Sequence, residues 1–239
     1  MKAQTKWFFI GLIGLLIFSR LAFALPSAPA ITYIYNSSAT SGLSNRTVDQ
    51  KGTITTVLLS ANQQDYKWKA YVGNVSGKVA LADANQMTIY DWNLGTSQGG
   101  KVLVSRFSNI DWATVACVNQ STIDAEEVGI SMSTTAADNI NSTFNYTTHK
   151  NFNVGVIPMS GCRSTATYIN GLSQGALTSG SYFQEVLLRD TTSGHMIYSS
   201  LMESAHNGFD NQPHDFQLLV AENESATVPT TYFFWVELG

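Results

Sequence analysis

Residues 182–201 read YFQEVLLRDTTSGHMIYSSL, which is two apolar runs separated by a polar link. The runs Tyr182 to Asp190 and His195 to Leu201 have strand length and contain β-branched and aromatic residues. The link between them, Thr191 to Gly194, is short and ends in glycine, as β-hairpin turns often do. This stretch therefore predicts two neighbouring antiparallel strands.

The same pattern of short apolar runs and Gly, Asn, Ser or Asp turns continues in both directions, and it predicts an all-β chain. Tyr66 to Val72 alternates, so Tyr66, Trp68, Ala70 and Val72 are expected on a buried face opposite two lysines. Thr231 to Glu237 is apolar on both faces and is expected to be a central strand. Such spacing favours an antiparallel β-sandwich of Greek-key or jelly-roll type. The other expected strands are Ile31 to Tyr35, Gly52 to Ser60, Lys78 to Ala82, Met87 to Leu94, Lys101 to Phe107, Ala113 to Val118, Phe152 to Ile157, Thr165 to Ile169 and Phe216 to Ala221.

One or two short helices are expected between the cysteines. Ser121 to Val128 begins with a hydroxyl and early acidic residues, as helix N-termini do. Ala136 to Phe144 is expected to be either a second short helix or a loop. Cys117 and Cys162 are the only cysteines. In an exported chain such a pair predicts one disulfide, which would hold this excursion against the sheet. A reactive or metal-binding thiol is the alternative.

Composition narrows the class of protein. Only 13% of the 239 residues are charged, against about 25% in a typical soluble domain. A formal charge of -4 argues against nucleic-acid binding, which needs a basic surface. The 5 Trp, 10 Tyr and 12 Phe supply enough apolar area to exclude a disordered chain. A weakly charged, well-packed domain remains.

Residues 1–24 have the layout of a secretory signal. Lys2 and Lys6 precede an apolar run, and Ala22-Phe23-Ala24 is a small-x-small cleavage site. The alternative is an uncleaved anchor, although the run is short for a bilayer. We expect an N-terminal strand and flexible segment at 25–45 and one sandwich domain at 46–239, with two tandem sandwiches divided near 171–180 as the alternative. The expected location is extracellular or at the cell surface, with no membrane span after cleavage.

Seven Asn-x-Ser/Thr sequons fit that location, because glycans attach to such sites on exported proteins. The alternative is that they are solvated turns that match by composition. The candidate acceptors are Asn36, Asn45, Asn74, Asn119, Asn141, Asn145 and Asn223.

Residues 206–215 combine two imidazoles and two carboxylates, the types of side chain that ligate divalent metals. The weak metal candidates are His206, Asp210, His214 and Asp215, and a calcium site that adds Glu222 or Glu224 is equally open. The spacing fits no zinc or EF-hand motif, and the segment is rich in Gly, Asn and Pro. A polar loop is therefore favoured, and we expect no metal and no cofactor.

Neither enzymatic activity nor a catalytic residue is expected. Ser173-Gln174-Gly175 and Ser179-Gly180 lack the strand-turn-helix context of a nucleophile elbow. Glu126 and Glu127 are adjacent in the expected helix, so they point about 100° apart and form no dyad. A hydrolase remains the least favoured of the functional alternatives.

Aromatic residues support a second alternative, a carbohydrate-binding module. Rings on a sandwich surface can stack on sugars, whereas alternation along strands favours core packing for the same rings. The candidate platform is Tyr66, Trp68, Tyr71, Tyr90, Trp92 and Trp112.

The signal segment, cysteine pair, sequons and low charge together resemble secreted prokaryotic β-sandwich surface glycoproteins. The layout is also similar to that of extracellular filament subunits, in which an N-terminal strand of one subunit completes the sheet of the next. It departs from type IV pilins, whose apolar segment follows the cleavage site. The resemblance implies a structural or adhesive protein that contacts itself, other surface proteins or glycans. Its candidate donor residues are Ile31, Tyr33 and Tyr35.

Overall fold

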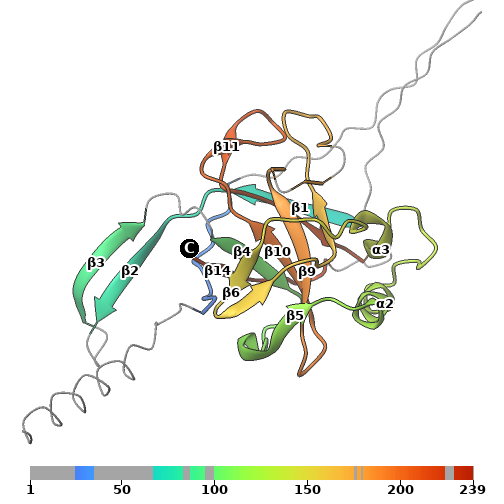
Figure 1. The fold of residues 1–239 in the computed structure, drawn as a ribbon, viewed down its shortest axis with the longest axis horizontal. Coiled ribbons are helices and arrows are strands. Elements are labelled where there is room, and N and C mark those ends of the chain that lie inside the picture. The colour runs from blue at the N-terminus through green and yellow to red at the C-terminus, as the bar shows by residue number, and fades with distance from the viewer. Residues whose placement is uncertain are drawn as a thin grey trace, which may run out of the picture.

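The computed structural model describes residues 25–34, 67–82, 87–94, 100–174, 177–178, 180–223 and 229–238. The expected signal segment, the strand at 52–60 and the flexible stretch Asn36 to Asn45 lie outside these residues. The described chain is mainly antiparallel β-structure with two short α-helices, as the sequence predicts (Figure 1). None of its helices is long and apolar enough to cross a membrane.

One antiparallel sheet forms the centre of the fold. Its strand order is β14-β4-β10-β9-β5, and β8 pairs with β9 beside β5. The sheet takes strands from both sides of residues 171–180, so it joins the two halves of the chain. Its members are β4 (Lys101–Ser105), β5 (Val115–Cys117), β8 (Ser164–Ala166), β9 (Gln184–Asp190), β10 (Met196–Leu201) and β14 (Phe233–Glu237).

The hairpin predicted at 182–201 is confirmed as β9 and β10, with Tyr198 opposite Leu187. Gly194 adopts a φ of +74°, a left-handed conformation that favours glycine. The Asp190 carboxylate accepts the backbone N–H groups of Thr192 and Ser193. Burial raises the pKa of Asp190, but hydrogen bonds from the Asp111 N–H, from these two N–H groups and from the Thr114 hydroxyl outweigh it and lower the pKa. Residues 190–194 therefore contain their own turn-forming interactions.

Both faces of the sheet are buried, which explains why its strands are almost continuously apolar. Val102, Val104, Leu187 and Tyr198 belong to one core, with the helices and β13 (Phe216–Ala221). The alternate positions face a second core: Leu103, Val186, Leu188, Ile197 and Trp235. The hairpin of β6 (Phe152–Val154) and β7 (Ile157–Met159) covers that second face. The sequence predicts a single strand at 152–157, and this is wrong because Gly155, at a φ of +56°, allows a turn.

Helices α2 (Gln120–Gly129) and α3 (Ile140–Thr143) lie between the two cysteines and contribute Ile123 and Ile140 to the first core. The disulfide Cys117–Cys162 is present, with the two Cα atoms 5.0 Å apart. Cross-linking a loop of this length stabilises a fold by about 4 kcal/mol in the chain-entropy account. The disulfide therefore holds the helical excursion against β5, as expected.

Strand β14 is an edge strand, so the expectation of a central position is wrong. It pairs with β4 on one side, and its other edge bonds only to Ser27 among the described residues. Its apolar character comes from coverage of both faces, because Phe234 and Val236 contact one core and Trp235 the other. A buried ion pair fixes it to β4, with Lys101 Nζ 2.9 Å from Glu237 Oε1.

The expected buried face of the strand at 66–72 is also wrong. Strand β1 (Trp68–Gly73) pairs with β13, but Ala70 and Val72 are exposed. Different neighbours cover its two faces: Trp68 donates to the Asp138 carbonyl at 2.8 Å, whereas Tyr71 packs edge-on against Phe234. The alternation therefore predicts the strand correctly, but it does not predict which face of the strand is buried.

Three small elements complete the described chain. A 3-10 turn at Trp112–Thr114 (η1) precedes β5, where the sequence predicts strand from Ala113. Strands β2 (Gly77–Ala82) and β3 (Thr88–Leu94) form a hairpin that extends away from the main sheet (Figure 1). Strands β11 (His206–Asn207) and β12 (Pro213–His214) form a shorter hairpin where a polar loop is expected.

Candidate functional site

The N-terminal segment, residues 28–34, is the most exposed apolar part of the described chain. Ile31, Tyr33 and Ile34 are 68%, 72% and 83% exposed. The strand expected at 31–35 is not formed, since residues 28–34 carry no strand and Tyr35 lies outside the described residues. Among the described residues, this segment does not have the strand partner that its sequence pattern predicts.

Proline explains why this segment leaves the sheet. Ser27 and Val236 exchange both backbone hydrogen bonds, at 3.0 and 2.7 Å, on the outer edge of β14. In an antiparallel register the next bonded pair would be Pro29 with Phe234. Pro29 has no N–H to donate, so the ladder ends there. Residues 30–34 are thereby released, although Ser27 remains fixed to the domain.

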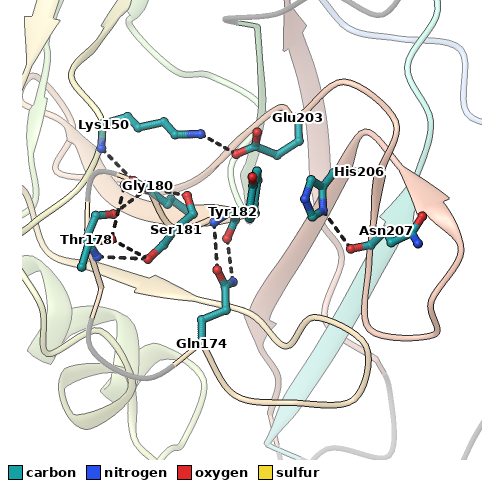
Figure 2. Close-up of polar contacts among 10 residues, drawn as sticks. Lys150, Gln174, Thr178, Gly180, Ser181, Tyr182, Glu203, His206 and Asn207 are labelled. Atoms are coloured by element: carbon teal, nitrogen blue, oxygen red, sulfur yellow. Dashed lines mark hydrogen bonds and ion pairs between the residues drawn. The ribbon is translucent and has the colours of Figure 1, made fainter.

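A second candidate site lies where the loop at 167–182 meets the β11–β12 hairpin, and Figure 2 shows its polar contacts. Gln174 holds Tyr182 by both backbone groups, at 2.7 and 2.8 Å. The Tyr182 ring stacks on His206 with centroids 3.6 Å apart, and Lys150 lies 5.6 Å from the ring centroid. Lys150 also pairs with Glu203 at 2.8 Å.

Exposed aromatic rings surround this point. Tyr168, Phe209 and Tyr182 are 55%, 44% and 39% exposed. The two loops are joined by the bond from Asn170 N–H to the Gly208 carbonyl, 2.7 Å long. We call the cluster of Tyr168, Phe209, Tyr182 and His206 the aromatic end. Sequence reasoning did not identify it because its rings come from loops with no common spacing.

The platform expected from sequence does not assemble in the described residues. Trp68 and Tyr71 pack against the first core, and Trp112 stacks edge-on against Trp235 with centroids 5.2 Å apart. Core packing is thus the role of these three rings. Tyr66 lies outside the described residues, and of Tyr90 and Trp92 only the backbone is described, in β3.

The sequons divide by exposure. Asn74, Asn119 and Asn145 are exposed, whereas Asn141 and Asn223 are partly buried. Asn36 and Asn45 lie outside the described residues. Asn119 is also the N-cap of α2, and its side-chain oxygen accepts from Thr122 N–H at 3.0 Å. A glycan attaches at the nitrogen, so capping and glycosylation use different atoms.

The metal candidates have other partners. Asp215 accepts backbone N–H groups from Val75 and Ala205, at 2.8 and 3.1 Å. Asp210 bonds His214 at 2.9 Å, and His206 stacks on Tyr182. No group of three or more metal-ligating side chains occurs in the described part of the chain. Glu222, the other calcium candidate described, pairs with Lys69.

Two Gly-x-Ser-x-Gly patterns are present, at 95–99 and 171–175, and sequence reasoning overlooked them. The first lies between β3 and β4, and the second precedes β9, so neither has the strand-turn-helix context of a nucleophile elbow. Glu126 accepts from Nε and Nη2 of Arg106, at 2.7 and 2.8 Å, and Glu127 accepts Asn141 N–H. Both glutamates therefore have structural partners.

Comparisons with family models, curated proteins and solved structures find no match to this chain. The functional conclusions below therefore depend on the geometry of the two candidate sites.

Proposed function

We propose that this protein is an exported, non-enzymatic structural subunit that self-associates through its N-terminal segment. The observation that carries the proposal is the exposure of Ile31, Tyr33 and Ile34 beside a strand edge to which the chain is already anchored at Ser27. The signal-like residues 1–24 and the Cys117–Cys162 disulfide support export, since structural disulfides persist in oxidising compartments. The sequons support a glycosylated surface.

The energetics favour pairing over simple apolar contact. Burying three large side chains contributes about 5–9 kcal/mol at roughly 1.5–3 kcal/mol each. Association costs about 4–15 kcal/mol in lost freedom. The free energy gained by burial and the free energy lost on association are of similar size. Side-chain burial alone would therefore not hold two copies of the chain together. Main-chain hydrogen bonds, as in strand addition, supply the remaining stabilisation.

The test is negative-stain electron microscopy and sizing chromatography of the mature chain. We expect fibres or other large species from the wild type. The variant Ile31→Ser, Tyr33→Ser, Ile34→Ser should elute as a folded monomer. The matched control Val128→Ser, Val156→Ser removes exposed apolar side chains elsewhere, at 70% and 65% exposure, and should still assemble. A monomeric wild type, or a triple variant that assembles normally, would contradict the proposal.

Carbohydrate binding is the second candidate function, and the aromatic end favours it. Exposed rings beside amide and charged groups are the chemistry that recognises sugars, and Gln174 and Gln217 hold the loop that carries them. A glycan array should show binding that Tyr168→Ala and Phe209→Ala abolish. Tyr146→Ala, which removes an exposed ring at another site, is the control. Equal binding by all three variants would count against this function.

A further inference from the structure

Strained backbone is concentrated at the aromatic end. Phe183 and Ala205 have φ values of +48° and +46°, a left-handed conformation that side chains other than Gly, Asn and Asp rarely adopt. Phe183 directly follows Tyr182 in the chain. Ala205 directly precedes His206, whose ring stacks on Tyr182. Because such strain persists only where the surroundings fix it, and gathers at binding and active sites, it marks this end of the molecule as a candidate binding site.

Gln217 joins the two loops that carry the exposed rings. It lies on β13, is only 4% exposed, and accepts the Phe209 N–H through Oε1 at 2.9 Å. Its Nε2 donates to the Tyr168 carbonyl at 2.8 Å and to the Thr167 hydroxyl at 3.0 Å. One buried amide thus fixes the backbone of Tyr168 relative to that of Phe209, although the two residues come from different loops.

The packing around this amide is close. A Cβ added to Gly208 would lie 2.9 Å from Gln217 Oε1 and 2.8 Å from a ring carbon of His214, too close without a shift of these side chains. Gln174 fixes both backbone groups of Tyr182 in the same way. The backbones that carry the three exposed rings are therefore held in place by the protein itself. A site that is already ordered loses less freedom on binding, which raises its affinity.

The charged groups at the aromatic end have partners within the chain. Lys150 pairs with Glu203 at 2.8 Å (Figure 2), and the Asp210 carboxylate bonds to His214 at 2.9 Å. Because these charges are met by their partners, they offer little attraction to a charged ligand. The exposed rings provide apolar faces for the C–H face of a sugar ring, and tyrosine hydroxyls can bond to sugar hydroxyls. This chemistry fits an uncharged saccharide.

We propose that the aromatic end is a preformed binding site for an uncharged saccharide, and that Gln217 is the residue that positions its rings. The inference rests on carbohydrate binding, the second candidate function, and adds the ligand class and the positioning residue. The rings of Tyr168, Tyr182 and Phe209 contact the saccharide. Gln217 is buried and acts through the backbones of the two loops.

Proteolysis tests the positioning role without a ligand. Gln217→Met keeps a side chain of similar length but removes its hydrogen bonds, so chymotrypsin should cleave after Tyr168 and Phe209 at least tenfold faster than in the wild type. The matched control Asn139→Leu removes another buried amide, which bonds backbone groups at the start of α3, and should leave both rates unchanged. Equal acceleration in the two variants, or none in Gln217→Met, would overturn the positioning role.

The glycan array tests the ligand class when its glycans are divided into neutral and acidic sets. We expect the wild type to bind neutral glycans with an affinity that salt changes less than about twofold, because salt screens only charges. Gln217→Met should bind at least tenfold more weakly, and Asn139→Leu should bind like the wild type. Binding confined to acidic glycans would overturn the inference and leave carbohydrate binding standing, whereas no binding to any glycan would overturn both.

A second variant keeps the inference testable if Gln217→Met does not fold. Gly208→Ala crowds the Gln217 amide while leaving every ring in the chain, and it should weaken glycan binding in the same direction. A folded Gly208→Ala chain that binds like the wild type would contradict the positioning role. Loss of self-association in Tyr168→Ala, without any effect on glycan binding, would show that the site receives a protein and would overturn the inference.

Discussion

Glu185 is a carboxyl group in the interior of the fold. It is fully buried on β9, where one oxygen accepts Leu219 N–H at 2.8 Å and the other has no partner. Burial disfavours the charged form, so the pKa of Glu185 is raised well above its usual value. Folding therefore keeps a proton on this side chain at pH values where the unfolded chain releases it.

This residue predicts that stability falls as pH rises above about 4.3, the usual glutamate pKa. Above that pH the unfolded state is deprotonated and the folded state is not, so stability is lost until the raised pKa is reached. The loss is up to about 1.4 kcal/mol per pH unit. Unfolding in urea between pH 5 and 8 should show this slope, and Glu185→Gln should flatten it.

The control for this prediction is Asp124→Asn, an exposed carboxylate on α2, which should leave the slope unchanged. The lowered pKa values of Asp190, Asp210 and Glu222 act in the opposite sense but at lower pH, outside this window. A slope that persists in Glu185→Gln would show that another group controls the pH dependence.

At the scale of elements, α2 depends on its first cap. Asn119 accepts from the N–H of Thr122 and from the hydroxyl of Ser121, each at 3.0 Å. Asn119→Ala should lower the free energy of unfolding by about 1 kcal/mol, the usual effect of losing such a cap. Asn119→Asp keeps an acceptor and should cost little, as denaturant unfolding of the unglycosylated protein can show.

The same pair of variants separates capping from glycosylation. Both remove the glycan acceptor at position 119, so both should lose the same glycan mass when produced in the native host. Only the alanine variant should also lose stability. A loss of stability shared equally by both variants would mean that the glycan, and not the cap, stabilises α2.

Elements that carry their own turn or cap could be predicted from sequence, and elements defined by distant partners could not. The β9–β10 hairpin and α2 follow from local residues, such as Gly194 and the polar residues at 119–122. The edge position of β14 depends on Ser27, more than 200 positions away. The apolar residues on both faces of β14 indicate that both faces are covered, but they do not indicate whether the strand is central or at an edge. The alternation of apolar residues identified the candidate donor residues in the sequence. The effect of Pro29 could not be predicted in the same way, because it depends on the register of Ser27 with Val236. The aromatic end brings together rings from separate loops. Their spacing along the sequence follows no strand or helix period, so their proximity could not be predicted from sequence.

At the scale of the whole molecule, the fold combines a disulfide-linked sheet that is covered on both faces with an N-terminal segment that is exposed. Proteolysis should distinguish the sheet from this segment. Among the described aromatic residues, Tyr33 should be the first that chymotrypsin cuts in the unassembled protein, because it is 72% exposed and outside any strand. Tyr198 and Phe144 are fully buried and should resist. Assembly should slow cleavage at Tyr33 at least tenfold by gel and mass analysis. Equal rates in monomer and assembly would argue that residues 30–34 are not part of the contact.

The released N-terminal segment has a consequence for the shape of any assembly. If the segment of one copy adds to a strand edge of the next, donor and acceptor are different surfaces of one chain, so the contact is heterologous and builds an open fibre or a ring rather than a closed symmetric dimer. A fibre of this kind is polar, with an empty acceptor edge at one end and an unused N-terminal segment at the other. A chain with Ile31→Ser, Tyr33→Ser and Ile34→Ser could still receive a segment but could not donate one. Added in small amounts, it would act as a terminator that caps growing fibres at a single end.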